Sequence, residues 1–186
     1  MKIKLSKINF NKIIFFLLFT ISIPNASFAQ VGDLYFQIKN TDFNIEKTRR
    51  SLDNLGRSIN FKNSVKKQKA KSLQVNVNII SQESYVAYSR AKQIIDELKK
   101  GNNYKLAEKV GNLRSDLYNL NYAANALNKY CQWMINKPRT HGEKSFKSMI
   151  RAFNTIIENY NKARKNKEIL SDVITWESMQ SIKNRN

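Results

Sequence analysis

The chain has 186 residues, of which 33 are lysine or arginine, 14 are aspartate or glutamate and one is histidine, so its formal charge is +19. An apolar fraction of 41% suffices for a packed core and argues against a disordered chain. Five glycines and two prolines are too few for the many turns of an all-β protein, and we expect one helical domain.

The N-terminal segment, residues 1–29, has the pattern of a cleavable secretory signal peptide. Four lysines precede a run of eleven uncharged and mainly apolar residues, 13–23, which is followed by a proline. A membrane-spanning helix needs about 20 apolar residues, so this run is too short to cross a bilayer. Ser27 and Ala29 supply the small side chains that a signal peptidase requires, which predicts cleavage after Ala29 and a mature chain that begins at Gln30.

Export follows from this prediction, with the protein in the periplasm, at the cell surface or in the medium. No cysteine follows the expected cut, so we expect no lipid anchor there, and we expect no transmembrane helix in the mature chain. Residues 1–29 hold four lysines and no acidic residue, so the mature chain keeps 29 basic and 14 acidic residues and a formal charge of +15.

The apolar residues of the mature chain recur in steps of three and four, the period of an amphipathic helix. The first of these seams consists of Leu34, Ile38, Thr41, Ile45, Thr48, Leu52, Leu55 and Ile59. The second consists of Leu73, Val77, Ile80, Ser84, Ala87, Ala91, Ile94 and Leu98. Residues 73–80 (LQVNVNII) also alternate as in a strand, but no partner strand or hairpin turn lies nearby, and we predict a helix there.

The third and fourth seams follow Gly101 and Pro138, respectively. The third consists of Leu106, Val110, Leu113, Leu117, Leu120, Ala124, Leu127, Cys131 and Met134. This helix must end before Pro138, because the residue that precedes a proline is disfavoured in helical geometry. Thr140 and Glu143 then have the spacing of a capping box, which predicts the start of a fourth helix. Its seam consists of Phe146, Met149, Phe153, Ile156, Tyr160, Ala163, Leu170 and Ile174.

The four seams predict an all-α fold, an antiparallel bundle of four long amphipathic helices formed by residues 30–186. The breaks between helices are expected at about residues 60–64, 100–103 and 137–142, and such short connections make neighbouring helices antiparallel. The first break lacks proline and glycine, so the alternative is a three-helix arrangement in which the first two helices are continuous.

The residue patterns of the common catalytic and metal sites are absent from the sequence. His141 is the only histidine, which excludes histidine-based zinc sites, and it lies in the expected capping turn. Cys131 occupies a seam position and is expected to be a buried, unreactive thiol. Asp96 and Glu97 are adjacent and would point to different faces of a helix. We therefore expect a protein that is not an enzyme and that uses no cofactor or metal.

The charge of the chain is concentrated at two of the three expected breaks. No acidic residue lies between Asp53 and Glu83, and in an up-down-up-down bundle the first and third connections lie at the same end. We call the resulting cluster the basic pole; it consists of Lys62, Lys66, Lys67, Lys69, Lys71, Lys137, Arg139, Lys144 and Lys147. Trp133 is expected nearby, with Glu143 as the neighbouring acidic residue. Such a field attracts anionic partners.

The sequence supports two functions of different classes. The first is a non-enzymatic binding module that engages an anionic polymer, a membrane surface or a partner protein through the basic pole and the helix faces. The second is a structural or assembly component of the cell envelope, in which the seams pack on helices of another copy or another subunit. A third explanation is that the charge only keeps the protein soluble. No small-molecule substrate is expected from the sequence.

Overall fold

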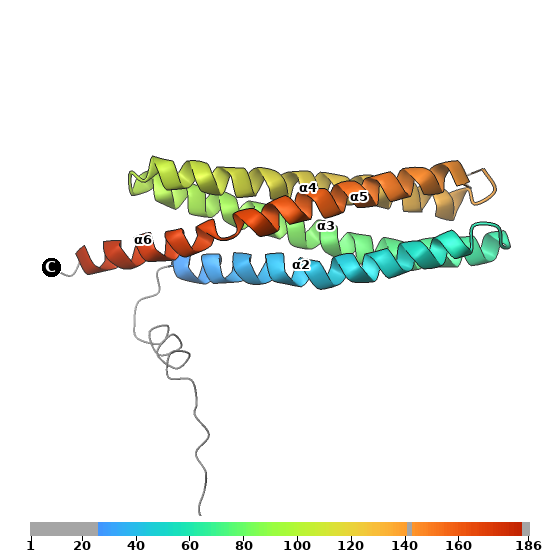
Figure 1. Ribbon diagram of the computed structural model, residues 1–186, viewed down its shortest axis with the longest axis horizontal. Coiled ribbons are helices and arrows are strands. Elements are labelled where there is room, and N and C mark those ends of the chain that lie inside the picture. The colour runs from blue at the N-terminus through green and yellow to red at the C-terminus, as the bar shows by residue number, and fades with distance from the viewer. Residues whose placement is uncertain (1–25, 141–142, 184–186) are drawn as a thin grey trace, which may run out of the picture.

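The computed structural model describes residues 26–140 and 143–183, and this part of the chain is helical with no strand (Figure 1). The helices are α2 (Ala26–Arg57), α3 (Asn63–Lys100), α4 (Tyr104–Asn136), α5 (Glu143–Asn166) and α6 (Ile169–Lys183). Helices α2 to α5 pack side by side, and successive helices run in opposite directions. The all-helical prediction is confirmed, and residues 73–80 lie within α3, as we predicted.

The predicted signal peptide falls almost wholly outside the described residues. Residues 1–25 are not described, and α2 begins at Ala26. The expected cleavage point after Ala29 therefore lies in the first turn of α2. The side chains of Val31 and Leu34, just beyond that point, are fully buried.

The chain turns between α2 and α3 at residues 58–62, so the three-helix alternative is wrong. The amide of Ser58 donates to the Leu55 carbonyl at 2.9 Å, and the amide of Phe61 donates to the Ser58 carbonyl at 3.0 Å. These bonds to the third preceding residue tighten the end of α2 into a turn. The Ser58 hydroxyl also donates to the Asn54 carbonyl at 2.8 Å, which occupies a carbonyl at the helix end. No proline or glycine is needed for this break.

The predicted seams form the core. All nine seam residues of α4 are buried, from Leu106 to Met134, and so are all eight of α3, from Leu73 to Leu98. In α2 the seam is buried from Leu34 to Leu55. The break between α3 and α4 lies at residues 101–103, where the side chain of Asn103 caps α4 by accepting a hydrogen bond from the Leu106 amide at 3.2 Å.

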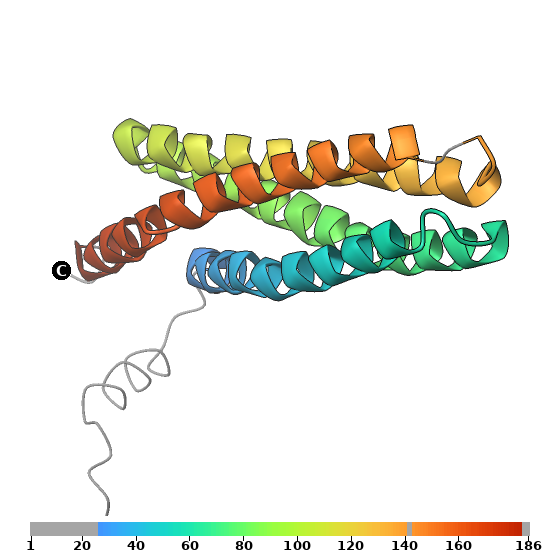
Figure 2. The ribbon, with the colours of Figure 1, turned by 45° about the vertical axis from the view of Figure 1, so that its right-hand side comes forward.

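The fourth predicted helix is divided in two, which corrects the sequence analysis. Helix α5 ends at Asn166 and α6 begins at Ile169, so the seam that we had assigned to one helix is shared between them. The Asn166 side chain donates to Asp116 of α4 at 2.6 Å, and this contact holds the end of α5 against α4. Helix α6 then lies near the N-terminal half of α2 (Figure 2).

Asparagine and serine side chains connect α3 to α4 outside the core. Asn121 donates to the Ser81 carbonyl at 2.7 Å, and the Ser81 hydroxyl donates to Asn125 at 2.9 Å. Farther along the same pair of helices, Asn128 donates to Asn78 at 2.7 Å. Because each bond joins residues at one specific register, the set fixes how far α3 can slide along α4.

Candidate anion-binding site

The two connections that carry the basic pole lie at the same end of the bundle (Figure 1). The α2–α3 turn contains Lys62, and the first turns of α3 contain Lys66, Lys67, Lys69 and Lys71. The α4–α5 connection holds Lys137 and Arg139, and the first turns of α5 hold Lys144 and Lys147. The fold thus brings together residues separated by about 70 positions in the sequence.

The nine residues of the basic pole differ in exposure. Seven are exposed: Lys62, Lys67, Lys71, Lys137, Arg139, Lys144 and Lys147. Lys69 is half-buried, and Lys66 is only 9% exposed. Lys66 precedes Ala70 and Leu73 by four and seven positions, so it lies on the buried stripe of α3. The charge that a partner can reach therefore comes mainly from the seven exposed residues.

Glu143 offsets part of this charge locally. Its Oε1 lies 2.8 Å from Nζ of Lys147, and the hydrogen bond from Lys147 holds the pKa of Glu143 below its usual range. Glu143 had been assigned to a capping box with Thr140. The Thr140 hydroxyl donates to the Lys137 carbonyl at 3.2 Å, while the two residues between Thr140 and Glu143, His141 among them, lie outside the described residues.

The opposite end of the bundle carries a more balanced charge. Around the α3–α4 connection, the exposed lysines are Lys92, Lys99, Lys100, Lys105 and Lys109. Asp96, Glu97 and Glu108 lie among them. Burial raises the pKa of Glu97 above its usual value, and the positive charge of Lys100 opposes that shift. The electrostatic field is therefore more strongly positive at the basic pole than at the opposite end of the bundle.

Aromatic side chains accompany the basic pole. Phe61, in the α2–α3 turn, is 60% exposed, and sequence analysis did not single it out. In the sequence, only its position next to Lys62 in an expected break between helices indicates that Phe61 accompanies the pole. Trp133 is 40% exposed and lies edge-on to Tyr130, with ring centroids 5.3 Å apart, and Nζ of Lys129 lies 5.3 Å from its ring centroid. Trp133 is thus held by its own helix near the end of α4.

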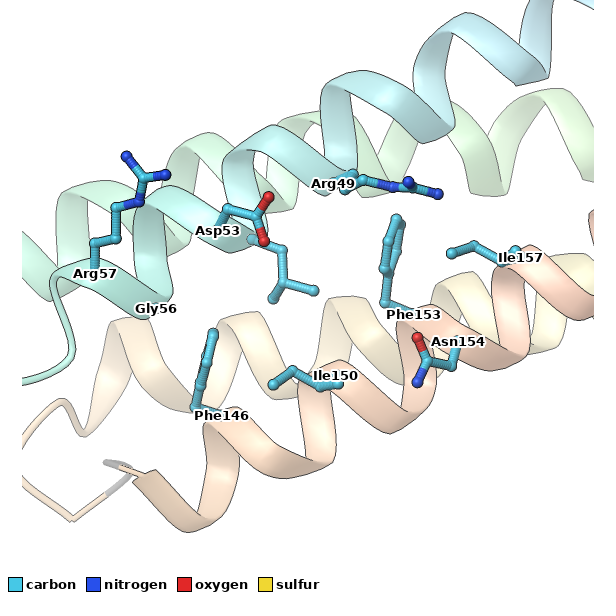
Figure 3. A pocket seen from close by; sticks show the side chains of 10 residues that line it. Arg49, Asp53, Gly56, Arg57, Phe146, Ile150, Phe153, Asn154 and Ile157 are labelled. Atoms are coloured by element: carbon cyan, nitrogen blue, oxygen red, sulfur yellow. The ribbon is translucent and has the colours of Figure 1, made fainter.

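An open groove runs between α2 and α5 beside the basic pole (Figure 3). Its volume is about 660 Å³. The apolar part of its lining consists of Leu52, Phe146, Ile150, Phe153 and Ile157, and the polar part consists of Arg49, Asp53, Arg57 and Asn154. Gly56 completes the lining on α2. The groove exists because α2 packs extensively on α3 but only sparsely on α5.

The remaining reactive groups have structural surroundings. Cys131 is fully buried, and burial raises the pKa of its thiol to about 12, so the thiolate is scarce at neutral pH. Within residues 26–140 and 143–183, no three histidine, cysteine or acidic side chains are grouped so that they could hold a metal ion. In the same part of the chain, no helix combines the length and the apolar character that crossing a membrane requires.

The geometry therefore offers two surfaces that could bind a partner, the basic pole and the adjoining groove. Among the described residues that form these two surfaces, none is a histidine or a cysteine. Comparisons with protein-family models, with curated proteins and with solved structures found no match to this chain.

Proposed function

We propose that this chain is a non-enzymatic binding module, exported by its signal peptide, that engages an anionic polymer or membrane surface through the basic pole. The observation that supports the proposal is the group of seven exposed cations at one end of the helical bundle, with Glu143 paired to one of them. Four of the seven, Lys67, Lys71, Lys144 and Lys147, lie in the first turns of α3 and α5, and the other three lie in the two connections. The fold therefore keeps their combined field at one end of the bundle, where an anionic surface can meet it.

The test is a charge reversal restricted to exposed residues of the pole. The variant replaces Lys62, Lys67, Lys71 and Lys144 with glutamate, which changes the local charge by eight units. All four side chains are exposed, so helical content and melting temperature should stay close to those of the unmodified protein. Lys66 is left in place because it is buried.

The matched control makes the same change at the opposite end, where Lys92, Lys100, Lys105 and Lys109 are also exposed. Binding to polyphosphate and to vesicles that contain anionic phospholipid is measured for both variants. We expect loss of binding only for the reversal at the pole, and a steep decrease for the unmodified protein as salt rises to physiological strength, where screening acts over about 8 Å. Equal loss in both variants would show that only net charge matters, and absence of binding by the unmodified protein would favour the solubility explanation.

Export has its own test, which does not depend on the ligand. Material recovered outside the cytoplasm of an expressing bacterium should begin at Gln30 when its N-terminus is sequenced. Recovery of the exported protein with Met1 intact would contradict cleavage after Ala29.

A second function is supported by a separate observation on α2. Phe36 and Phe43 are 59% and 64% exposed and lie seven residues apart, so they share one face of the helix. Such a face suits packing on another subunit, as a structural or assembly component of the envelope requires. Sedimentation of the protein at several concentrations tests self-association, and replacement of both phenylalanines with serine should abolish it without the salt dependence expected of the pole.

A further inference from the structure

We propose that the groove between α2 and α5 binds one fatty acid of medium to long chain length, with the alkyl chain along the apolar lining and the carboxylate at Arg57. This inference goes beyond the proposed function, because it depends on residues that are not part of the basic pole. It also assigns a small-molecule ligand, which the sequence did not lead us to expect.

The apolar lining forms a continuous track on α5. Phe146, Ile150, Phe153 and Ile157 succeed one another at intervals of three and four residues and all line the groove. Figure 3 shows the rings of Phe146 and Phe153 directed toward α2. From Phe146 to Ile157 the track rises by about 16 Å, since each of eleven residues adds about 1.5 Å. This length accommodates a medium to long alkyl chain in an extended form. Leu52 faces the track from α2.

Part of this track is exposed to water in the structure. Ile150 is 38% exposed, and the side chains of Phe146 and Ile157 are half-buried, whereas Phe153 at the base is only 4% exposed. An alkyl chain laid along the track would cover the exposed part of these side chains. Removal of apolar surface from water on both sides of the contact supplies the driving force.

The size and closure of the groove favour a thin ligand over another helix. Helices α2 and α5 already touch at the end near the pole, where a Cβ atom added to Gly56 would lie 2.6 Å from Cζ of Phe146. A helix with its side chains is about 10–12 Å wide and has no room to pass this point. The groove volume of about 660 Å³ falls in the range of about 300–1,000 Å³ that is usual for small-molecule sites.

The charges at the groove favour an anionic head group. Arg57 forms no ion pair in the part of the chain that the structure describes, and it is the lining residue next to the basic pole. Figure 3 shows its side chain directed away from α5, so the exposed side chain must turn toward the groove to pair with the carboxylate. Arg49 lies two turns away, and its contact with Glu46 is long, 3.8 Å between Nε and Oε2. Asp53 lies between the two arginines, so the charged lining keeps a net charge of one positive unit. A guanidinium group pairs with a carboxylate through two parallel hydrogen bonds, which suits Arg57 to a fatty acid.

The first experiment varies the chain length of the ligand. Binding of octanoate, decanoate and dodecanoate to the purified protein is measured by calorimetry below the concentrations at which they form micelles. Affinity should rise about two- to fourfold per methylene, since full burial of a methylene corresponds to about fourfold. An affinity that is independent of chain length would overturn the proposal, because it would mean that only the carboxylate is bound.

The second experiment places a charge in the track. Ile150→Glu should weaken dodecanoate binding by about tenfold or more, because the chain would lie against an ionised carboxylate. The matched control is Val86→Glu on α3, since Val86 is 40% exposed and Ile150 is 38% exposed. Circular dichroism and thermal melting establish that both variants are folded. Unchanged binding by Ile150→Glu, or equal loss in Val86→Glu, would overturn the proposal.

The third experiment tests the position of the head group. Arg57→Gln should weaken dodecanoate binding by about two- to fivefold, the range of an exposed ion pair, and Asp53→Asn should strengthen it. Neither change should alter the affinity for a neutral ligand with the same alkyl chain, such as dodecanol. The pole reversal described above should leave the dependence on chain length intact, so failure of the pole as an anion-binding surface and failure of the groove as a fatty-acid site are distinguishable. Equal effects of Arg57→Gln on both ligands would overturn the placement of the carboxylate.

Discussion

Asn44 of α2 is the main hydrogen-bond donor to Glu83 of α3. The replacement Asn44→Ala tests how much this contact contributes to the stability of the fold. Asn44 is 8% exposed, and its Nδ2 lies 2.9 and 2.8 Å from the two carboxylate oxygens of Glu83. The hydroxyl of Thr41 also points to Glu83, but at 3.5 Å it is too distant to replace the amide. The variant therefore leaves a half-buried carboxylate without its principal donor.

The expected loss of stability is about 2 kcal/mol at neutral pH, because hydrogen bonds to charged groups contribute about 1.5–3 kcal/mol. For a chain of this size, such a loss lowers the melting temperature by about 4–8 °C. Asn54→Ala is the matched control, since Asn54 is an exposed asparagine of the same helix and the replacement has the same effect on helix propensity.

The cost of Asn44→Ala should also depend on pH. Burial raises the pKa of Glu83 above its usual value, while the hydrogen bonds from Asn44 and Thr41 act to lower it. The native state thus holds a proton on Glu83 at pH values where the unfolded chain has lost it, and the contribution of Glu83 to stability falls as pH rises through that window. At about pH 4 the carboxyl is largely neutral, so its bond to Asn44 is weaker and the loss should shrink to about 1 kcal/mol.

Urea unfolding followed by circular dichroism at about pH 4 and about pH 7 measures both losses. Glu83→Gln should remove this part of the pH dependence, because its amide oxygen still accepts from Asn44 without carrying a charge. Equal losses for Asn44→Ala at the two pH values, or a loss no greater than that of Asn54→Ala, would refute the reasoning.

Three further predictions concern packing. Leu120→Ala should lower the free energy of unfolding by about 2–5 kcal/mol in urea titrations, because Leu120 is 1% exposed at the centre of α4. Alkylation of Cys131 by iodoacetamide should be slow in the native protein and fast in urea, and rapid native labelling would contradict an inert thiol. Gly111→Ala should raise the free energy of unfolding by about 0.5–1 kcal/mol, because a Cβ there meets nothing within 4 Å. Gly56→Ala should raise it by less, because the added Cβ must displace Phe146.

The helices and their buried faces could be predicted because both depend on local sequence. A residue on the stripe that recurs every three or four positions faces the neighbouring helices wherever the helix lies. The same rule places Lys66 on the buried stripe of α3, four residues before Ala70, although we had grouped it with the exposed lysines of the pole. We assigned Lys66 to the pole because of its charge, but its position on the stripe determines that it is buried.

The break between α5 and α6 could not be predicted from the seam. Residues 164–168 contain no proline or glycine, and Ala163 and Leu170 are seven positions apart, so the pattern continues unbroken across the break. What distinguishes this point is a tertiary contact, the bond from Asn166 to Asp116 of α4. Because Asp116 lies fifty residues away in the sequence, only the folded arrangement reveals it.

The groove illustrates the same limit for the candidate binding surfaces. Phe146, Phe153 and their neighbours have the spacing of a core stripe, and that spacing is equally compatible with full burial and with a groove. Which of the two occurs depends on how closely α2 approaches α5. Helix α2 is held to α3 by polar contacts, among them the pair of Asn44 with Glu83 and the ion pair of Arg90 with Asp33. Those contacts fix α2 on its α3 side and leave its other side only sparsely packed, so the apolar stripe of α5 remains partly open to water beside the cationic end of the bundle.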